Sequence, residues 1–181
     1  MTYPTETAYA LGGNALLPGV VEAVFRLKGR SAEKALLLLV DGHRGLEGLV
    51  RDVSTSAGRL MARFWPGPLT LVFLAAKECP PHLPDARGTL ALRWSPHPLV
   101  AELHRLSPVP LIGTSANPSG APPLHDCPSV LAAFPRGLAL ALDGGPTPGG
   151  APSTLVDTTC DPPRILRHGA VPDAAVWAAL K

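Results

Sequence analysis

Two cations separated by one glycine stand near the end of an expected helix. Residues 25–31 read FRLKGRS, and an apolar run over residues 35–40 follows closely. One reading is structural, because cations in the last turn of a helix complement its dipole. The other is chemical. Gly29 permits a tight turn, so Lys28 and Arg30 can converge on one anion, with a point charge from the lysine and forked donors from the arginine.

A second polar segment lies at the start of the chain. Residues 3–12 read YPTETAYALG and offer the hydroxyls of Thr5 and Thr7, the carboxylate of Glu6 and the aromatic ring of Tyr9. These groups could line a binding pocket. The alternative is an ordinary strand-to-helix turn in which a threonine serves as the helix cap.

Two further polar loops lie next to expected strands. Residues 113–120 read GTSANPSG after the apolar stretch VPLI, and ligands of α/β sheets bind at such carboxyl ends of strands. Residues 143–154 read DGGPTPGGAPST and are followed by RHG at 167–169. Their glycines would let backbone approach a ligand closely. A polar turn and a flexible surface loop are the respective alternatives.

Several chemistries are excluded by missing motifs. The chain has neither a GxxxxGK[ST] loop nor a GxGxxG loop, and its six histidines never fall at HxH or HExxH spacing, so we expect no metal site built by the protein. The start of a nucleophile elbow fails because Asn117 replaces the second glycine, which argues against a serine hydrolase.

Composition limits the partners and the compartment. A formal net charge of +2 is too small to indicate extensive nucleic-acid binding, although a local basic pocket remains open. The three cysteines are widely spaced and form no CxxC pair, as is typical of reduced thiols. No apolar run approaches the ~20 residues of a membrane span, and no secretory signal is evident. We therefore expect a cytoplasmic protein with no membrane contact.

The apolar periodicity predicts one α/β domain over residues 1–181. Alternating strands and helices imply a largely buried, partly parallel sheet. Helices are expected over residues 18–27, 46–64, 98–106, 126–134 and 172–180, and strands over 35–40, 69–75, 89–94, 109–113, 138–142, 154–157 and 165–167.

Taken together and in order, seven segments resemble the threonylcarbamoyl-AMP synthase family of YrdC-like proteins. They are YPTETAYALG, KGR, FWPGPLTLVF, LALRW, TSANPSG, DGGPTPGGAPSTLVD and ILRHGAV, and they run from Tyr3 to about Val171. The resemblance implies a single-domain twisted mixed α/β sheet with flanking helices and a concave basic pocket. It also implies that L-threonine, bicarbonate and ATP yield threonylcarbamoyl-AMP and pyrophosphate, with Mg²⁺ carried mainly by the phosphates. A tRNA threonylcarbamoyl-transferase complex would receive the product for the N6-threonylcarbamoyl modification of adenosine 37.

The resemblance also implies roles for individual residues. The family tetrad maps onto Lys28 and Arg30, which would hold the ATP phosphates, and onto Ser115 and Asn117, which would bind near the α-phosphate. The other implied substrate- and nucleotide-binding residues are Thr5, Thr7, Tyr9, Arg93, Thr114, Ser153, Thr154 and Arg167. No protein nucleophile is needed, because a carbamate attacking phosphorus requires mainly positioning and charge neutralisation.

The chain departs from the family pattern at several positions. Only Met1 and Thr2 precede Tyr3, where the family usually carries a lead-in helix and strand, so we expect a shortened first strand whose neighbours have unpaired backbone groups. Ala10 replaces a preferred glycine, and Ser31 and Ala35 replace common prolines. Two alternatives stay open: a YrdC-like protein that binds RNA or nucleotide without synthase activity, and a carbamoyl-transfer domain of the kind found in hydrogenase maturation. Any RNA binding is expected to be weak.

Overall fold

In the computed structural model, which describes residues 1–29 and 36–181, the chain forms two β-sheets that meet each other. The large sheet has the order β6-β3-β5-β4-β8-β9 and the small sheet the order β1-β2-β7. The strands of the large sheet are β3 (Leu37–Leu39), β4 (Leu69–Leu74), β5 (Thr89–Arg93), β6 (Leu111–Ile112), β8 (Thr154–Asp157) and β9 (Arg164–Arg167). Those of the small sheet are β1 (Thr2–Pro4), β2 (Tyr9–Leu11) and β7 (Thr114–Ser115).

The large sheet is mixed, as predicted. Strand β3 is parallel to β5, and β4 is parallel to β8, while its other neighbouring pairs are antiparallel. The small sheet is antiparallel throughout. The first five residues of β4 are all buried, which explains why this strand shows a continuous apolar run rather than alternation.

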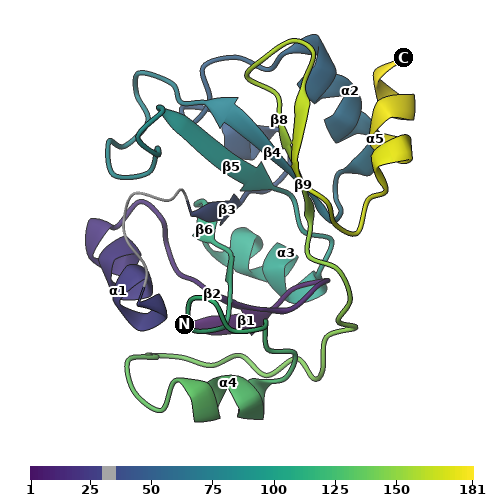
Figure 1. Cartoon of the computed structure of the whole chain (residues 1–181). Coiled ribbons are helices and arrows are strands. Elements are labelled where there is room, and N and C mark those ends of the chain that lie inside the picture. Colours follow the sequence, from purple (N-terminus) through teal and green to yellow (C-terminus); the bar gives the residue numbers. More distant parts are fainter. Residues whose placement is uncertain (30–35) are drawn as a thin grey trace.

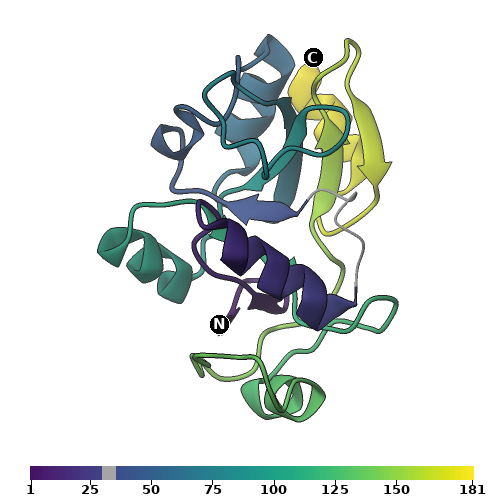
Figure 2. The ribbon, with the colours of Figure 1, turned by 90° about the vertical axis from the view of Figure 1, so that its left-hand side faces the viewer.

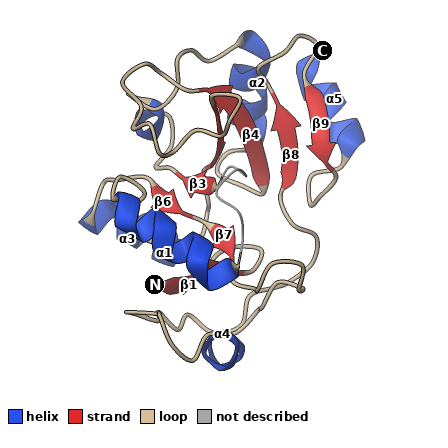
Figure 3. Ribbon diagram, turned by 60° about the vertical axis from the view of Figure 1, so that its left-hand side comes forward, coloured by secondary structure: helices blue, strands red, loops and turns tan. Residues whose placement is uncertain are grey.

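The helices flank the two sheets. They are α1 (Pro18–Lys28), α2 (Thr55–Phe64), α3 (Pro98–Leu106), α4 (Cys127–Ala133) and α5 (Asp173–Leu180), with a 3-10 turn, η1, at Arg44–Leu46. Figures 1 and 2 show α2 and α5 side by side next to the large sheet, whereas α4 lies at the opposite end of the molecule. In Figure 3, α1 runs in front of the small sheet.

Local signals determine where α1 begins and ends. Pro18 occupies the first turn, where its missing N–H is not needed. Gly29 ends the helix in the left-handed conformation, with φ 60°, and its N–H donates to the Arg26 carbonyl. This ending directs the last helical side chain, Lys28, toward the interior, where it is buried.

The two sheets are joined at a single glycine. Strands β6 and β7 are consecutive, and only Gly113 separates them, so the chain passes directly from the large sheet into the small one. The fully buried Tyr3 of β1 donates its phenol proton to the Ile112 carbonyl at 2.6 Å, across this junction. Tyr3, Ala10, Leu39, Val100 and Leu111 form a separate apolar cluster here, beside the main core.

The predicted helix over residues 46–64 is wrong in its first half. Residues 50 and 51 instead pair with the end of β4: Val50 forms a bridge with Ala75, and the Arg51 N–H donates to the Leu74 carbonyl at 2.9 Å. Helix α2 begins only after Ser54, whose side chain accepts from the Ala57 N–H. Tertiary pairing therefore overrides the helical spacing of the earlier apolar residues.

The prediction of a strand over residues 138–142 is also wrong. It is reduced to one parallel bridge between Ala141 and Thr2, supported by backbone hydrogen bonds from Thr2 to Leu140 and from Leu142 to Thr2. This bridge gives β1 a partner on the side opposite β2. Strand β1 is therefore paired on both sides, and the expectation of a shortened first strand stays a prediction. Within the described residues, none of the helices has the length and apolarity to cross a bilayer.

We expect Gly12→Ala to destabilise the protein because the added methyl group would overlap the Ile112 carbonyl and the Tyr3 ring at the sheet junction. Overpacking of this kind lowers the free energy of unfolding by about 2 kcal/mol. The matched control is Gly58→Ala, since a methyl group in the middle of α2 would meet nothing within 4 Å and should stabilise the helix by about 1 kcal/mol. Urea unfolding measures both; equal stabilities of the two variants would contradict the tight junction.

The stability should also fall in alkali, and Tyr3 should account for part of the loss. Burial raises the pKa of Tyr3, and the charge of Arg93 opposes this only partly. A tyrosine in the unfolded chain ionises at about pH 10, whereas folded Tyr3 keeps its proton. The free energy of unfolding therefore falls as the pH rises above about 10. Tyr3→Phe should flatten the decline in unfolding free energy between about pH 9 and 11. An unchanged slope would contradict this role.

Candidate functional site

A cavity of about 500 Å³ opens where the two sheets meet. Its wall combines residues from β2 and β7 of the small sheet with residues from β3, β4, β5, β8 and β9 of the large sheet, and with the last residue of α1. Most of the predicted site residues line it: Thr5, Thr7, Tyr9, Lys28, Arg93, Thr114, Ser115, Asn117, Ser153 and Arg167. The structure therefore brings together residues from six separate places in the sequence.

Lys28 lies at one end of the wall and holds the loop after β7. Its ammonium donates to the Ser115 carbonyl at 2.5 Å and to the Asn117 carbonyl at 3.0 Å, and the side chain is only 5% exposed. The Ser115 hydroxyl donates to the Asn117 side-chain oxygen, whose amide group donates onward to the carbonyls of Pro118 and Ala121. The members of the predicted tetrad that the structure describes thus form one hydrogen-bonded network.

Arg93 enters the cavity from the end of β5. Its guanidinium pairs with the Glu6 carboxylate at 2.9 Å and lies 3.5 Å from the Thr7 hydroxyl, which is in turn 3.2 Å from that of Thr5. Burial lowers the pKa of Arg93, and the negative charge of Glu6 opposes this shift. The first loop and β5 are therefore joined by a buried ion pair.

Arg167 reaches the same cavity from β9. Its Nε and Nη2 atoms donate to the Ser153 carbonyl at 3.1 and 2.7 Å, and Nη2 also lies 3.0 Å from the Ser153 hydroxyl. Partial burial lowers the pKa of Arg167, and the positive charge of Arg93 lowers it further. This mutual repulsion shows that the two arginines share one electrostatic region, which an anion would stabilise.

Two predicted residues are not placed on the cavity wall. Thr154 is fully buried, and its hydroxyl donates to the Val171 carbonyl at 2.7 Å and accepts from the Val171 N–H at 3.0 Å. Thr154 joins β8 to the segment before α5. Because its side chain does not line the cavity, its position does not support the implied binding role. Arg30 lies outside the described residues, as do the substituted positions Ser31 and Ala35.

The cavity also contains polar residues that the sequence analysis did not single out. Thr70 of β4 lies 2.7 Å from the Ser153 hydroxyl, oxygen to oxygen, and is the one hydroxyl in the strand LTLVFL, a signal that could have revealed it. His125 lies on the wall with its Nδ1 atom 3.0 Å from the Thr147 hydroxyl. A lone histidine outside any ligand spacing carries no such signal.

Tyr9 fastens the glycine-rich loop beside the cavity. Its phenol oxygen lies 2.8 Å from the Gly145 carbonyl and 3.2 Å from an Asp143 carboxylate oxygen, and it accepts from the Gly144 N–H. Burial is the main reason why the pKa of Tyr9 is raised, and Asp143 adds to the shift. The same loop reaches the cavity wall at Gly150.

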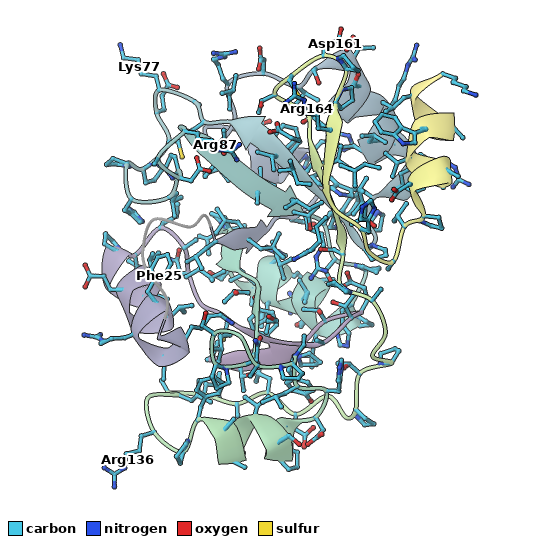
Figure 4. The ribbon with its side chains drawn as sticks, viewed as in Figure 1. Phe25, Lys77, Arg87, Arg136, Asp161 and Arg164 are labelled. Carbon is cyan, nitrogen blue, oxygen red and sulfur yellow. The ribbon has the colours of Figure 1, made fainter. Side chains whose placement is uncertain are left out.

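The cavity is positively charged. The described residues on its wall include Lys28, Arg93 and Arg167 but no aspartate or glutamate. Other cations, such as Lys77 and Arg136, point outward at opposite ends of the molecule (Figure 4). In the described part of the chain, no group of three or more histidine, cysteine, aspartate or glutamate side chains could hold a metal ion. The fold and the cavity thus define an α/β protein with a basic pocket whose charge suits an anionic small molecule.

Comparison with known proteins places the chain within one family. The Sua5/YciO/YrdC family model, described as telomere recombination, matches residues 1–169, and the chain belongs to this family. It is 37% identical to a threonylcarbamoyl-AMP synthase of Pyrococcus abyssi, covering 95% of this chain and 51% of that protein. It is also 37% identical to a threonylcarbamoyl-AMP synthase of Thiobacillus denitrificans, covering 92% of this chain and 87% of that protein.

A solved structure agrees with the family assignment. The crystal structure of Pyrococcus abyssi Sua5 complexed with L-threonine matches with a TM-score of 0.93 and 36% identity, over 99% of this chain and 53% of that chain. The chain therefore spans about half the length of its Pyrococcus relative. The predicted family and the predicted α/β fold with a twisted mixed sheet are confirmed.

We expect Tyr9→Phe to release the glycine-rich loop. The variant loses the contacts of the phenol oxygen with Gly144 and Gly145, so stability should fall by about 1 kcal/mol and amide exchange over residues 143–150 should accelerate. Hydrogen–deuterium exchange followed by mass spectrometry measures this. In the control Thr159→Val, which removes a hydroxyl bound to Asp157, exchange in the loop should not change. Unaltered exchange in Tyr9→Phe would show that the loop is held elsewhere.

Proposed function

We propose that this chain is an L-threonylcarbamoyladenylate synthase that makes threonylcarbamoyl-AMP and pyrophosphate from L-threonine, bicarbonate and ATP. The observation that carries the proposal is the cavity lined by Lys28, Arg93 and Arg167, with no acidic residue among its described lining. Such a site suits a triphosphate, which needs charge neutralisation along its length. The Pyrococcus relative with L-threonine bound supports threonine as the second ligand.

The proposed reaction has two steps. The threonine amine first attacks carbon in bicarbonate, forming an N–C bond and releasing water, which leaves a carbamate. A carbamate oxygen then attacks the α-phosphorus of ATP, and the bond from that phosphorus to the bridging oxygen breaks, releasing pyrophosphate. Both nucleophiles come from the substrates, so the protein contributes position and electrostatic stabilisation rather than a covalent intermediate.

The residues divide these tasks according to where they lie. Lys28 and the loop it holds, residues 115–121, would bind the phosphates near the α-phosphorus through the lysine and Ser115. Arg30 would assist Lys28 in the tetrad. Arg93 and Arg167 would bind anionic groups at the large-sheet side, where the hydroxyls of Ser153, Thr5 and Thr7 supply neutral donors.

Mg²⁺ would accompany the nucleotide rather than bind first to the protein. The described lining offers hydroxyls and cations but no carboxylate, so it lacks the ligands that this ion prefers in a protein-built site. When bound, the ion would neutralise the triphosphate charge.

The product would pass to a tRNA threonylcarbamoyl-transferase complex, and any direct RNA contact would be weak at a net charge of +2. We also propose that residues 1–181 form a single domain and that the protein lies in the cytoplasm. Three free cysteines agree with that compartment, because thiols stay reduced there.

The test is a product assay by mass spectrometry with ATP, Mg²⁺, L-threonine and bicarbonate. We expect a threonine-dependent adenylate together with pyrophosphate. Lys28→Ala should lower its rate of formation by about 100-fold or more, because a preorganised cation is lost from the charged transition state. In Arg136→Ala, which removes an outward-pointing cation, the rate should not change. Thermal unfolding of each variant separates lost chemistry from lost folding.

Two outcomes would contradict this proposal. Full activity in a folded Lys28→Ala protein would remove the lysine from the mechanism. A wild-type protein that binds ATP but forms no adenylate would favour the alternative, a YrdC-like nucleotide-binding protein without synthase activity.

A further inference from the structure

Glu6 is a mostly buried carboxylate that lies next to the cavity but not on its wall. It lies in the turn between β1 and β2, whose neighbouring residues Thr5 and Thr7 do line the cavity. Its side chain is 16% exposed, and its Oε1 atom is 2.9 Å from Nη1 of Arg93. Any effect of Glu6 on a ligand must therefore pass through another side chain.

Arg93 has an enclosed donor without a partner beside this pair. The residue is 3% exposed and lines the cavity, yet its Nε atom has no hydrogen-bond partner. Oε1 of Glu6 also lacks a hydrogen bond, so the pair is joined by charge at short range rather than by an aligned donor. A buried guanidinium with a free N–H is incomplete, because nearly all such groups are paired in folded proteins. Because Nε is enclosed, a ligand oxyanion would reach Arg93 through the part of its guanidinium that lines the cavity.

Glu6 is itself held from a second direction. The buried Ser95 hydroxyl donates to Oε2 of Glu6 at 2.5 Å and accepts from the His97 N–H at 3.2 Å. Ser95 and Arg93 are two residues apart at the exit of β5, so both carboxylate oxygens are directed at the same short segment. The carboxylate thus has one orientation, with its charge next to the guanidinium.

We propose that Glu6 is a positioning residue that holds Arg93 in one orientation, so that the guanidinium on the cavity wall meets a substrate oxyanion. The oxyanion is either a phosphate of ATP or the carboxylate of L-threonine, which share the chemistry that a guanidinium recognises. Without its partner, a buried arginine both loses charge stabilisation and gains rotational freedom. This inference rests on the proposed function for its substrates but concerns a residue that touches neither of them.

The experiment compares Glu6→Gln with Glu102→Gln. The first keeps the shape of the side chain and removes the charge facing Arg93. The second removes the charge from an exposed glutamate that pairs with Arg105 at 2.6 Å on α3, far less buried than Glu6, and serves as the matched control. We expect Glu6→Gln to lower kcat/KM at least tenfold and Glu102→Gln to leave it unchanged. A rise in KM for ATP identifies the phosphate as the oxyanion, and a rise in KM for threonine identifies the carboxylate.

A double-mutant cycle tests whether Glu6 acts through Arg93. We expect Arg93→Gln to lower kcat/KM by at least as much as Glu6→Gln, and the double variant to be no worse than Arg93→Gln alone. Glu6→Asp should recover part of the activity. Losses that multiply in the double variant, or full activity in Glu6→Gln, would overturn the proposal.

A binding measurement separates this inference from the proposed function. If the wild-type protein forms no adenylate, the proposed function fails, and the affinities for ATP and for L-threonine are measured directly by calorimetry. Weaker binding of either ligand to Glu6→Gln than to Glu102→Gln would then still support the positioning role. Equal affinities of the two variants for both ligands would overturn it.

Discussion

The hydrogen bond from Tyr3 to the Ile112 carbonyl joins the small sheet to the end of the large one, and the cavity is lined by residues of both sheets. Tyr3 is fully buried and lies 109 residues from its partner. Just beyond Ile112, Gly113 carries the chain from β6 into β7. Tyr9 and Ser115 come from the small sheet, whereas Arg93 and Ser153 come from the large sheet or its edge. All of them face one another only while the junction is intact.

The buried cations around the cavity are stabilised in different ways, and this difference suits different tasks. Lys28 contacts carbonyl oxygens of the loop that it organises, so its charge is not cancelled by those groups. Arg93 faces the carboxylate of Glu6, which offsets the cost of burying the guanidinium charge. Arg167 contacts the oxygens of Ser153 and is repelled by Arg93. The result is a site with net positive charge, which an anionic ligand would neutralise.

Elements with strong local signals were predicted well. The buried run of β4, the proline that opens α1 and the proline at the start of α3 each determine structure over a few residues, and the structure agrees. The start of α2 was predicted wrongly, because Val50 pairs with Ala75 across the sheet, and periodicity cannot reveal that contact. The short strands β1, β2 and β7 contain few residues each, so their pairing arises from the tertiary fold.

The order of the motifs along the chain was enough to predict the family, the α/β class and ten of the residues that line the cavity, because the motifs can be recognised locally in the sequence. The orientation of those residues required the folded protein. Thr154 carries a hydroxyl as Ser153 does, but strand alternation turns it into the core toward Val171. Glu6 and Arg93 are 87 residues apart, so their pairing depends on where β5 lies beside the first turn. Long-range charge pairs of this kind follow from packing, which no local pattern encodes.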